Sequence, residues 1–184
     1  MVYVSGGNQL IDAKFILKKI RVHEGKVVAD LGCGGAGHFI IPAGKWVGKK
    51  STVYAVDILR SALEEVSKKA RLMGIKNIKT IWSNLEIPGS TKLSDNELDI
   101  AFLINILFQS KEDKNIMTEA ARILKPGGKL LVIDWNSTRV PFGPPLVDRV
   151  DPNEIKEIAK TLGLKIMDEF DAGKFHFGLI FKKQ

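Results

Sequence analysis

Short, continuously apolar segments rich in β-branched residues alternate with amphipathic segments along most of the chain, and this alternation limits the folds open to it. Apolar runs of strand length occupy residues 27–31, 52–56, 78–82, 98–104 and 129–135. Apolar residues at helical spacing occupy residues 10–20, the stretch that ends near 47, and residues 61–73 and 111–124. Continuous apolar strands between helices are typical of a parallel sheet covered on both faces. The sequence therefore predicts a doubly wound α/β sheet.

The last third of the chain departs from this pattern. A loop rich in Pro and Gly at residues 140–145 leads to a predicted helix at 152–162, with Asp151 as its N-cap. Two strands follow at 164–170 and 175–182, and residues 171–173 separate them. Because so short a connection joins antiparallel strands, we expect a single domain over residues 1–184 that ends in an antiparallel hairpin.

Composition excludes several classes of protein. The single cysteine, Cys33, rules out an internal disulfide framework and a cysteine-cluster zinc site, and the three histidines lack zinc-ligand spacing. We therefore expect no metal. No apolar run approaches the roughly 18 residues that a membrane span requires, and residues 1–7 lack the pattern of an export signal. These features predict a cytoplasmic protein without a membrane span.

The chain is basic, with 28 Lys and Arg against 21 Asp and Glu and a net charge of +7. Such a balance is compatible with an anionic partner such as nucleic acid. The cations nevertheless occur in pairs or short clusters on segments predicted to be amphipathic helices, with no long block of like charge. We therefore interpret them mainly as solvent-facing helix surfaces.

A glycine-rich turn follows the first predicted strand. Gly32, Gly34 and Gly37 satisfy the spacing GxGxxG where a strand ends and a helix begins. Asp57 ends the second strand 20 residues beyond Gly37, the spacing at which an acid accepts hydrogen bonds from a ribose. Together these residues predict a cofactor that contains adenosine.

Asp30, two residues before the first glycine, indicates which cofactor. A dinucleotide places its pyrophosphate at this turn, where a nearby carboxylate would repel it. S-adenosylmethionine has no phosphate and carries a cationic sulfonium and ammonium, which a carboxylate attracts. Asp30 therefore favours S-adenosylmethionine over NAD and disfavours an NAD-dependent oxidoreductase.

Four segments in this order, residues 27–37, 53–57, 98–107 and 124–135, resemble the class I S-adenosylmethionine-dependent methyltransferases. The resemblance is nearest to the small-molecule branch that includes the quinone-biosynthesis and arsenite methyltransferases. It implies a Rossmann-like sheet of seven strands, mostly parallel, whose C-terminal strand is antiparallel.

The resemblance also implies a set of cofactor-binding residues. Asp30 and the glycines Gly32, Gly34 and Gly37 would hold the methionine end, Asp57 the ribose, and Asn105 would face the sulfonium. Ile58 would lie beside the adenine. Ser83 stands where many relatives carry an acid, so the adenine contacts expected from Ser83, Asn84 and Leu85 shift toward the last two.

The predicted activity is transfer of the methyl group of S-adenosylmethionine to a small-molecule acceptor by direct displacement. Such catalysis needs mainly proximity and alignment, with a base only where the acceptor must lose a proton. One alternative is an RNA or DNA methyltransferase, because Asn105-Ile-Leu-Phe108 matches the ends, without the prolines, of a base-methylating motif. Another is a protein that binds S-adenosylmethionine without catalysis.

His176 is the candidate catalytic residue. It lies in a segment, residues 173–178, that resembles a small-aromatic-His-aromatic-Gly sequence in one branch of the family. Strand alternation places Phe175 and Phe177 on one face and His176 on the other. Two interpretations remain open: His176 packs and bonds a backbone carbonyl, or it reaches an acceptor pocket beneath the 140–145 loop as a base or orienting group.

Overall fold

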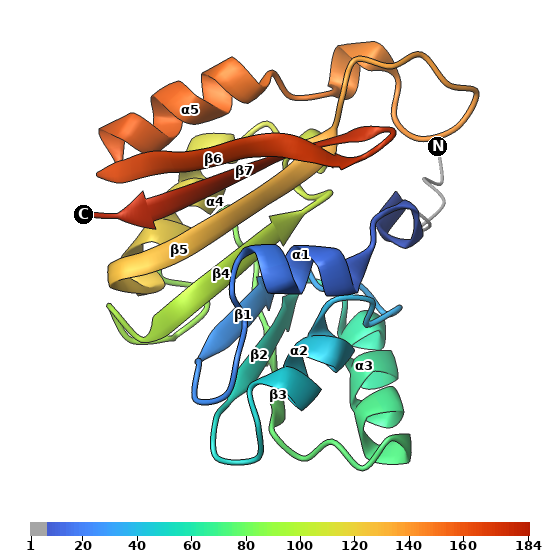
Figure 1. Cartoon of the computed structure of the whole chain (residues 1–184), viewed down its shortest axis with the longest axis vertical. Coiled ribbons are helices and arrows are strands. Elements are labelled where there is room, and N and C mark those ends of the chain that lie inside the picture. Colours follow the sequence, from blue (N-terminus) through green and yellow to red (C-terminus); the bar gives the residue numbers. More distant parts are fainter. Residues whose placement is uncertain (1–6) are drawn as a thin grey trace.

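The computed structural model describes residues 7–184, so the predicted start of the domain at residue 1, and most of the segment considered for an export signal, lie outside the described residues. A twisted sheet runs through the middle of the molecule with helices on both sides (Figure 1). The elements in chain order are η1 (Gly7–Leu10), α1 (Ala13–Lys19), β1 (Val28–Leu31), α2 (Ile40–Trp46), β2 (Val53–Asp57), α3 (Arg60–Leu72), β3 (Ile78–Trp82), β4 (Leu98–Ile104), η2 (Leu107–Gln109), α4 (Asp113–Ile123), β5 (Leu124–Trp135), η3 (Leu146–Asp148), α5 (Pro152–Thr161), β6 (Leu164–Gly173) and β7 (His176–Lys183).

The seven strands form one sheet in the order β3-β2-β1-β4-β5-β7-β6. The first five of these are parallel, and β7 is antiparallel to both of its neighbours. The predicted mostly parallel, seven-stranded sheet with an antiparallel C-terminal strand is therefore confirmed. The strand order reverses between β1 and β4, and open α/β sheets bind ligands outside the carboxyl ends of the strands at such a point.

The helices cover the two faces of the sheet unequally. Ile16 of α1, Ile40 of α2 and Val66 of α3 belong to one buried cluster, whereas Met117 of α4 and Ile155 of α5 belong to the other. Each of these side chains is almost fully buried and contributes roughly 1.5–3 kcal/mol to folding. Both faces of the central strands are covered, which explains why those strands are continuously apolar.

Side-chain caps set the start of two helices. The carboxylate of Asp12 accepts hydrogen bonds from the backbone N–H groups of Lys14 and Phe15 at the start of α1. Asp151 does the same for the N–H of Asn153, so its predicted role as the N-cap of α5 is confirmed. A cap of this kind is worth about 1 kcal/mol.

The hairpin at the end of the chain turns later than the sequence predicts. Strand β6 continues through residues 171–173, the predicted connection, and pairs to the end, with Gly173 opposite His176. Gly173 adopts a φ of 138°, which few other residues can adopt. The turn therefore consists of Lys174 and Phe175 alone, and Phe175 lies in the turn rather than on the strand.

Strand β5 also begins earlier than predicted, at Leu124. Leu124 pairs with Leu98, and the next pair along the strands is Lys129 with Ile100, so the register shifts across residues 125–128. The Pro-Gly-Gly sequence, predicted as a helix stop, thus forms an irregular entry into the strand. Among residues 7–184, none of the helices has both the length and the apolar character needed to cross a bilayer.

Candidate active site

The glycine turn joins β1 to α2 at the carboxyl end of the sheet. Gly32, Gly34 and Gly37 have φ values of 83°, 58° and 67°, a left-handed conformation that residues with a side chain rarely adopt. The position of a Cβ on Gly34 has no neighbouring atom within 4 Å. The turn therefore exposes backbone that a ligand can approach closely, as the motif predicts.

Asp57 connects this turn to the end of β2. Its Oδ2 accepts a hydrogen bond of 2.8 Å from Gly34 N, and its Oδ1 accepts one of 2.9 Å from Leu59 N. The side chain is buried, yet each carboxylate oxygen can accept more than one hydrogen bond. Asp57 is thus held rigidly and retains the capacity to accept hydrogen bonds from two hydroxyl groups.

Asp30 lies on β1 between the two neighbouring strands, opposite Ala55 and Phe102. Its side chain is buried, and burial together with the negative charge of Asp57 raises the pKa of Asp30 to about 7. Two carboxyl groups held together in this way favour a cationic ligand, because a positive charge relieves their repulsion.

Asn105 ends β4 with an unusual backbone and an unsatisfied side chain. Its φ is 57°, its side chain is buried, and its Nδ2 donates a 2.7 Å hydrogen bond to Asn8 Oδ1. Its Oδ1 is buried and has no hydrogen-bond partner among the described residues. A buried acceptor without a partner costs about 1–3 kcal/mol, so the site is arranged for a ligand that donates a hydrogen bond or carries positive charge.

Two residues of this site, Asn8 and Ile106, were not predicted from the sequence. Asn8 comes from η1, 97 residues away from its partner Asn105, and its type and position carry no signal in the sequence. Ile106 lies so close to Gly32 that a Cβ at Gly32 would overlap its side chain. Asn8 thus contacts the residue that follows β4, and Ile106 packs against the glycine turn.

The predicted adenine region follows β3. Ser83 is buried, donates from its N–H to Asp57 O at 3.0 Å, and has its hydroxyl 2.7 Å from that of Ser90. Asn84 Oδ1 accepts from Glu86 N, so part of its side chain is used to hold the loop. Leu85 is buried. The structure therefore brings Ser83, the first residue of this segment, next to Asp57.

An exposed apolar rim borders the same region. The side chain of Ile58 is half exposed, as is that of Trp82, whose indole N–H donates a 2.8 Å hydrogen bond to Ile58 O. The guanidinium of Arg60 lies 4.5 Å from the centre of the Trp82 ring. Sequence reasoning named Ile58 but missed Trp82, although a tryptophan at the carboxyl end of a strand is a usable signal for a flat ligand.

His176 opens β7 beside the carboxyl end of β5. It pairs with Trp135, and the two ring centroids are 4.5 Å apart. The side chain is fully buried, and neither ring nitrogen has a hydrogen-bond partner among the described residues. The interpretation that His176 bonds a backbone carbonyl is therefore wrong. Burial and the positive charge of Arg149 lower the pKa of His176 to about 4, so the ring is neutral at pH 7.

The loop between β5 and α5 packs on Trp135, the residue that contacts His176. Phe142 contacts both Trp135 and Phe175 edge to face, with centroid distances of 6.2 and 5.2 Å. Gly143 adopts a φ of 76°, and a Cβ there would lie 2.6 Å from the Trp135 ring. Phe142 of the loop thus joins Trp135 and Phe175 in one cluster of aromatic rings, and Trp135 packs against His176.

Arg149, which sequence reasoning did not single out, holds this loop in place. Its guanidinium donates hydrogen bonds to the backbone oxygens of Pro144, Asn136 and Thr138. It also lies 5.5 Å from the centre of the Trp135 ring. These three hydrogen bonds fix the loop in place beside Trp135.

The remaining candidates for reactive or metal-binding groups are Cys33 and clusters of acidic or histidine side chains. Cys33 is buried in the glycine turn, and burial raises the pKa of its thiol, so it is a poor nucleophile. No cluster of three or more His, Cys, Asp or Glu side chains suited to a metal ion occurs in the part of the chain that the structure describes.

Residues 22–175 match the family described as a methyltransferase domain, and the chain belongs to that family. The fold and the site define a class I S-adenosylmethionine-dependent methyltransferase, as the sequence motifs predict. S-adenosylmethionine is the cofactor of this class. The residues present fit it, because Asp30, Asp57 and the unpartnered Asn105 Oδ1 suit its cationic groups and hydroxyls, and the open space at Gly34 leaves the turn accessible.

Individual relatives agree with this class. The ubiquinone/menaquinone biosynthesis C-methyltransferase UbiE of Blochmanniella floridana is 35% identical over 72% of this chain, which covers 51% of that protein. A SAM-dependent methyltransferase from Aquifex aeolicus has a TM-score of 0.86 at 27% identity, covering 98% of this chain and 94% of its own. An arsenic(III) S-adenosylmethionine methyltransferase from Chlamydomonas reinhardtii has a TM-score of 0.68 at 25% identity, covering 86% of this chain and 63% of its own. The chain spans about half the length of the UbiE protein it matches.

Proposed function

We propose that this protein transfers the methyl group of S-adenosylmethionine to a small, flat acceptor by direct displacement. The observation that carries the proposal is the cluster of aromatic rings formed by Trp135, Phe142 and Phe175, whose member Trp135 lies against the neutral His176 at the same end of the sheet as the glycine turn. Neither ring nitrogen of His176 has a hydrogen-bond partner among the described residues. The cofactor supplies an activated methyl group on a sulfur that leaves readily. The residues of the chain then have to bind, orient and exclude water.

Each of the proposed cofactor-binding residues binds a different part of S-adenosylmethionine. Asp57 holds the ribose hydroxyls, and the glycine turn with Asp30 holds the methionine end. Ile58, with residues Ser83, Asn84 and Leu85, borders the adenine. Asn105 offers its free Oδ1 toward the sulfonium, where an oxygen stabilises positive charge.

The acceptor side favours an aromatic molecule with a hydroxyl group, such as a quinone precursor. Aromatic walls bind flat rings, and the neutral His176 accepts a hydrogen bond or a proton from an acceptor hydroxyl. Arsenite is less well supported as the acceptor, because proteins bind such soft elements through thiolates. The only cysteine of this chain, Cys33, is buried in the glycine turn. Since His176 is fully buried, the loop held by Arg149 has to move for the acceptor to enter.

Labelled S-adenosylmethionine and a panel of acceptors test the proposal. Quinone precursors should be methylated, whereas arsenite, tRNA and rRNA should not. Methylation of an RNA alone would replace this function by the nucleic-acid alternative, and binding of cofactor without methylation of any acceptor would favour the non-catalytic one.

The role of His176 is tested with a methylated acceptor in hand. His176→Ala should lower turnover by roughly a hundredfold, the typical contribution of a general base, without changing affinity for S-adenosylhomocysteine. The exposed His23 provides the matched control, and His23→Ala should leave turnover unchanged. Loss of thermal stability with full turnover per folded molecule would make His176 a packing residue only.

The domain organisation and the cellular compartment are inferred from the sheet and from the cysteine content. We infer that residues 1–184 act as a single domain, since one sheet extends from β1 to the last strand, β7. We also infer a cytoplasmic location, because the single cysteine and the absence of a disulfide framework suit a reducing compartment.

A further inference from the structure

A basic hollow lies at the opposite edge of the sheet from the glycine turn, where the central strands begin. Its volume is about 330 Å³. It is bordered by the turn after α1, by the start of β4 and by the irregular entry into β5. Its lining residues are Ile20, Arg21, His23, Lys26, Asp99, Ile100 and 125–129.

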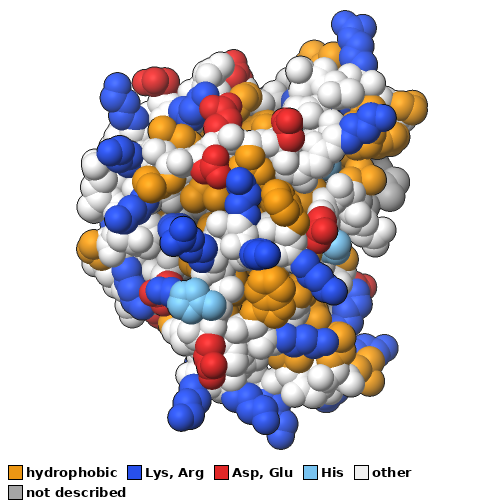
Figure 2. Space-filling view, in the orientation of Figure 1, with side chains coloured by type: hydrophobic (Ala, Val, Ile, Leu, Met, Phe, Trp, Pro, Cys, Tyr) orange, Lys and Arg blue, Asp and Glu red, His pale blue; other side chains and the backbone are white. Residues whose placement is uncertain are grey.

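Positive charge dominates the hollow. Arg21, Lys26, Lys125 and Lys129 line it together with one carboxylate, that of Asp99. Lys and Arg side chains gather with a histidine left of centre on the face shown in Figure 2. These cations come from a turn and from β5, so the expectation that the basic residues lie mainly on helix surfaces does not hold here.

The single carboxylate of the hollow already has three hydrogen-bond donors. Asp99 accepts hydrogen bonds from Lys26 Nζ at 3.3 Å, from Lys125 Nζ at 3.1 Å and from Val27 N at 2.9 Å. Burial acts to raise the pKa of Asp99, but these bonds lower it below the ordinary value. Asp99 therefore stays ionised and neutralises Lys26 and Lys125 in part. Within residues 7–184, Arg21 and Lys129 have no carboxylate partner of their own.

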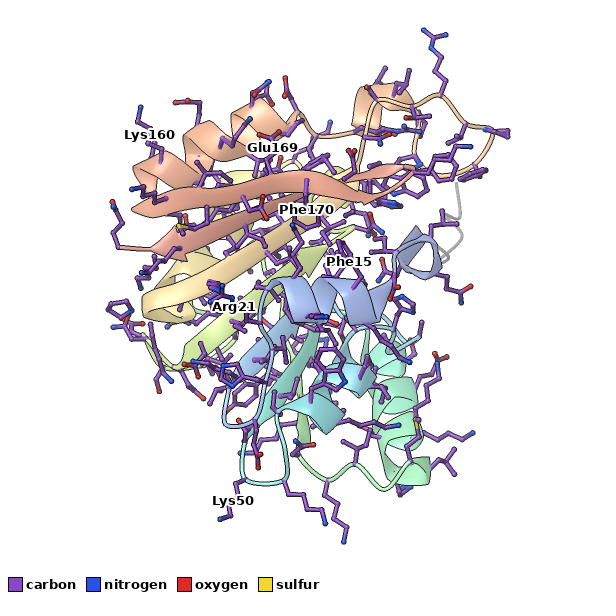
Figure 3. The ribbon with its side chains drawn as sticks, in the orientation of Figure 1. Phe15, Arg21, Lys50, Lys160, Glu169 and Phe170 are labelled. Carbon is purple, nitrogen blue, oxygen red and sulfur yellow. The ribbon has the colours of Figure 1, made fainter. Side chains whose placement is uncertain are left out.

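The two remaining cations repel each other. Burial lowers the pKa of Lys129, and the charges of Arg21, Lys26 and Lys182 lower it further. In the described part of the chain, the ammonium of Lys129 has one hydrogen-bond acceptor, Ile20 O at 3.3 Å. Among residues 7–184 the Arg21 guanidinium has no hydrogen-bond or ion-pair partner, and Figure 3 shows the side chain beside the start of the central strands. An anion in the hollow would relieve this repulsion.

We propose that this hollow is a second ligand site, separate from the cofactor and acceptor sites, which binds a small molecule that carries two or more phosphoryl groups. Its volume falls at the lower end of the roughly 300–1,000 Å³ typical of small-molecule sites. The planar fork of Arg21 suits phosphate oxygens, and the lysines supply point charges around it. A nucleic acid would instead use a row of cations that continues along the surface.

Calorimetry with inorganic tripolyphosphate at 0.15 M salt tests the site. One saturable site per chain is expected, and saturating S-adenosylhomocysteine should leave the affinity unchanged. Arg21→Gln and Lys129→Gln should each weaken binding by about tenfold, the loss of one charge-assisted contact.

Two matched controls remove the same charge elsewhere. Lys50 and Lys160 are exposed and lie outside the hollow (Figure 3), so Lys50→Gln and Lys160→Gln should leave tripolyphosphate binding unchanged. Melting temperatures of all four variants distinguish the loss of a contact from the loss of the fold. Should Lys129→Gln fail to fold, the result for Arg21→Gln decides the test.

Three results would overturn the proposal. Equal weakening by all four variants would show that only net charge matters. Displacement of tripolyphosphate by S-adenosylhomocysteine would place the anion in the cofactor site. Tighter binding of a single-stranded RNA, with several chains on each strand and a steep dependence on salt, would make this face a nucleic-acid surface.

Discussion

The two edges of the central sheet differ in charge and in burial. At the carboxyl edge Asp30, Asp57 and Asn105 are all less than a tenth exposed, and two of them are acids. At the amino edge the side chains of Lys26 and Lys125 remain 35% and 41% exposed. One sheet thus presents a buried, negative site at one edge and an open, positive one at the other.

The difference shows how each edge can select its ligand. A buried carboxylate is costly unless hydrogen bonds hold it, and Asp57 meets this condition through Gly34 N and Leu59 N. A partly exposed cation keeps much of its hydration, so four cations can gather around the single carboxylate of Asp99. The carboxyl edge is therefore rigid and specific for a cationic cofactor, whereas the amino edge attracts anions and is more sensitive to salt.

The largest expected effect comes from Asp30→Asn. The pKa of Asp30 in the folded protein, about 7, exceeds its ordinary value of 3.8. Its contribution to stability is therefore fully present below pH 3.8 and is lost as the pH rises through 7. The variant should be more stable than the parent at pH 8, by up to about 4 kcal/mol, and equal to it near pH 4. Urea unfolding at both pH values measures this.

A control for this prediction is Asp134, another buried acid whose pKa burial raises to about 7. Asp134→Asn should change the pH dependence in the same direction, but only Asp30→Asn should weaken binding of S-adenosylmethionine. A stability difference for Asp30→Asn that is the same at pH 4 and pH 8 would contradict the assignment.

The second effect concerns affinity for the cofactor. Asp57→Ala should weaken binding of S-adenosylhomocysteine by about 1.5–3 kcal/mol, because a charge-assisted hydrogen bond is lost. Calorimetry measures the change. Asp168, a partly exposed acid on β6 that pairs with Lys19, serves as control, and Asp168→Ala should leave affinity unchanged. An unaltered dissociation constant for Asp57→Ala would remove Asp57 from the site.

The third test compares two glycines with nearly equal φ angles. Gly25 and Gly32 have φ values of 85° and 83°, but only at Gly32 would a Cβ overlap a neighbour, the side chain of Ile106. Alanine at either position should cost about 1–2 kcal/mol of stability through its backbone. Gly32→Ala should cost about 1 kcal/mol more through overpacking, and it alone should reduce cofactor affinity. Equal stability and equal affinity in the two variants would show that Ile106 yields without cost.

The smallest effect is expected at the amino edge. Asp99→Asn removes the one carboxylate of the basic hollow, so tripolyphosphate should bind about two- to fivefold more tightly, in keeping with a partly exposed ion pair worth about 0.5–1 kcal/mol. Cofactor affinity should not change, because the two sites lie at opposite edges. Calorimetry with each ligand checks both statements, and weaker tripolyphosphate binding would exclude the hollow as an anion site.

The contrast between the edges also explains how far prediction from sequence can reach. Gly32, Gly34 and Asp57 lie at fixed distances from strand ends, so strand and turn rules place them together without knowledge of the tertiary structure. The position of the hairpin turn was predicted wrongly, at residues 171–173 instead of 174–175. The difference depends on the backbone conformation of Gly173, which the sequence pattern does not specify. The surroundings of His176 could not be predicted from the sequence. Alternation along a strand gives the face on which a side chain lies, but it does not give the residues that cover that face.

The sequence by itself determined the fold class, the glycine turn and the acid that accompanies it, because periodicity, glycine conformation and strand ends act over a few residues. Only the tertiary structure decided that Asn8 bonds Asn105, that Arg149 holds a loop beside Trp135, and that cations from a turn and from β5 converge on one hollow. The physical reason is sequence separation. These contacts join residues far apart in the chain, and which side chains meet there depends on how strands pair and helices pack rather than on any local pattern.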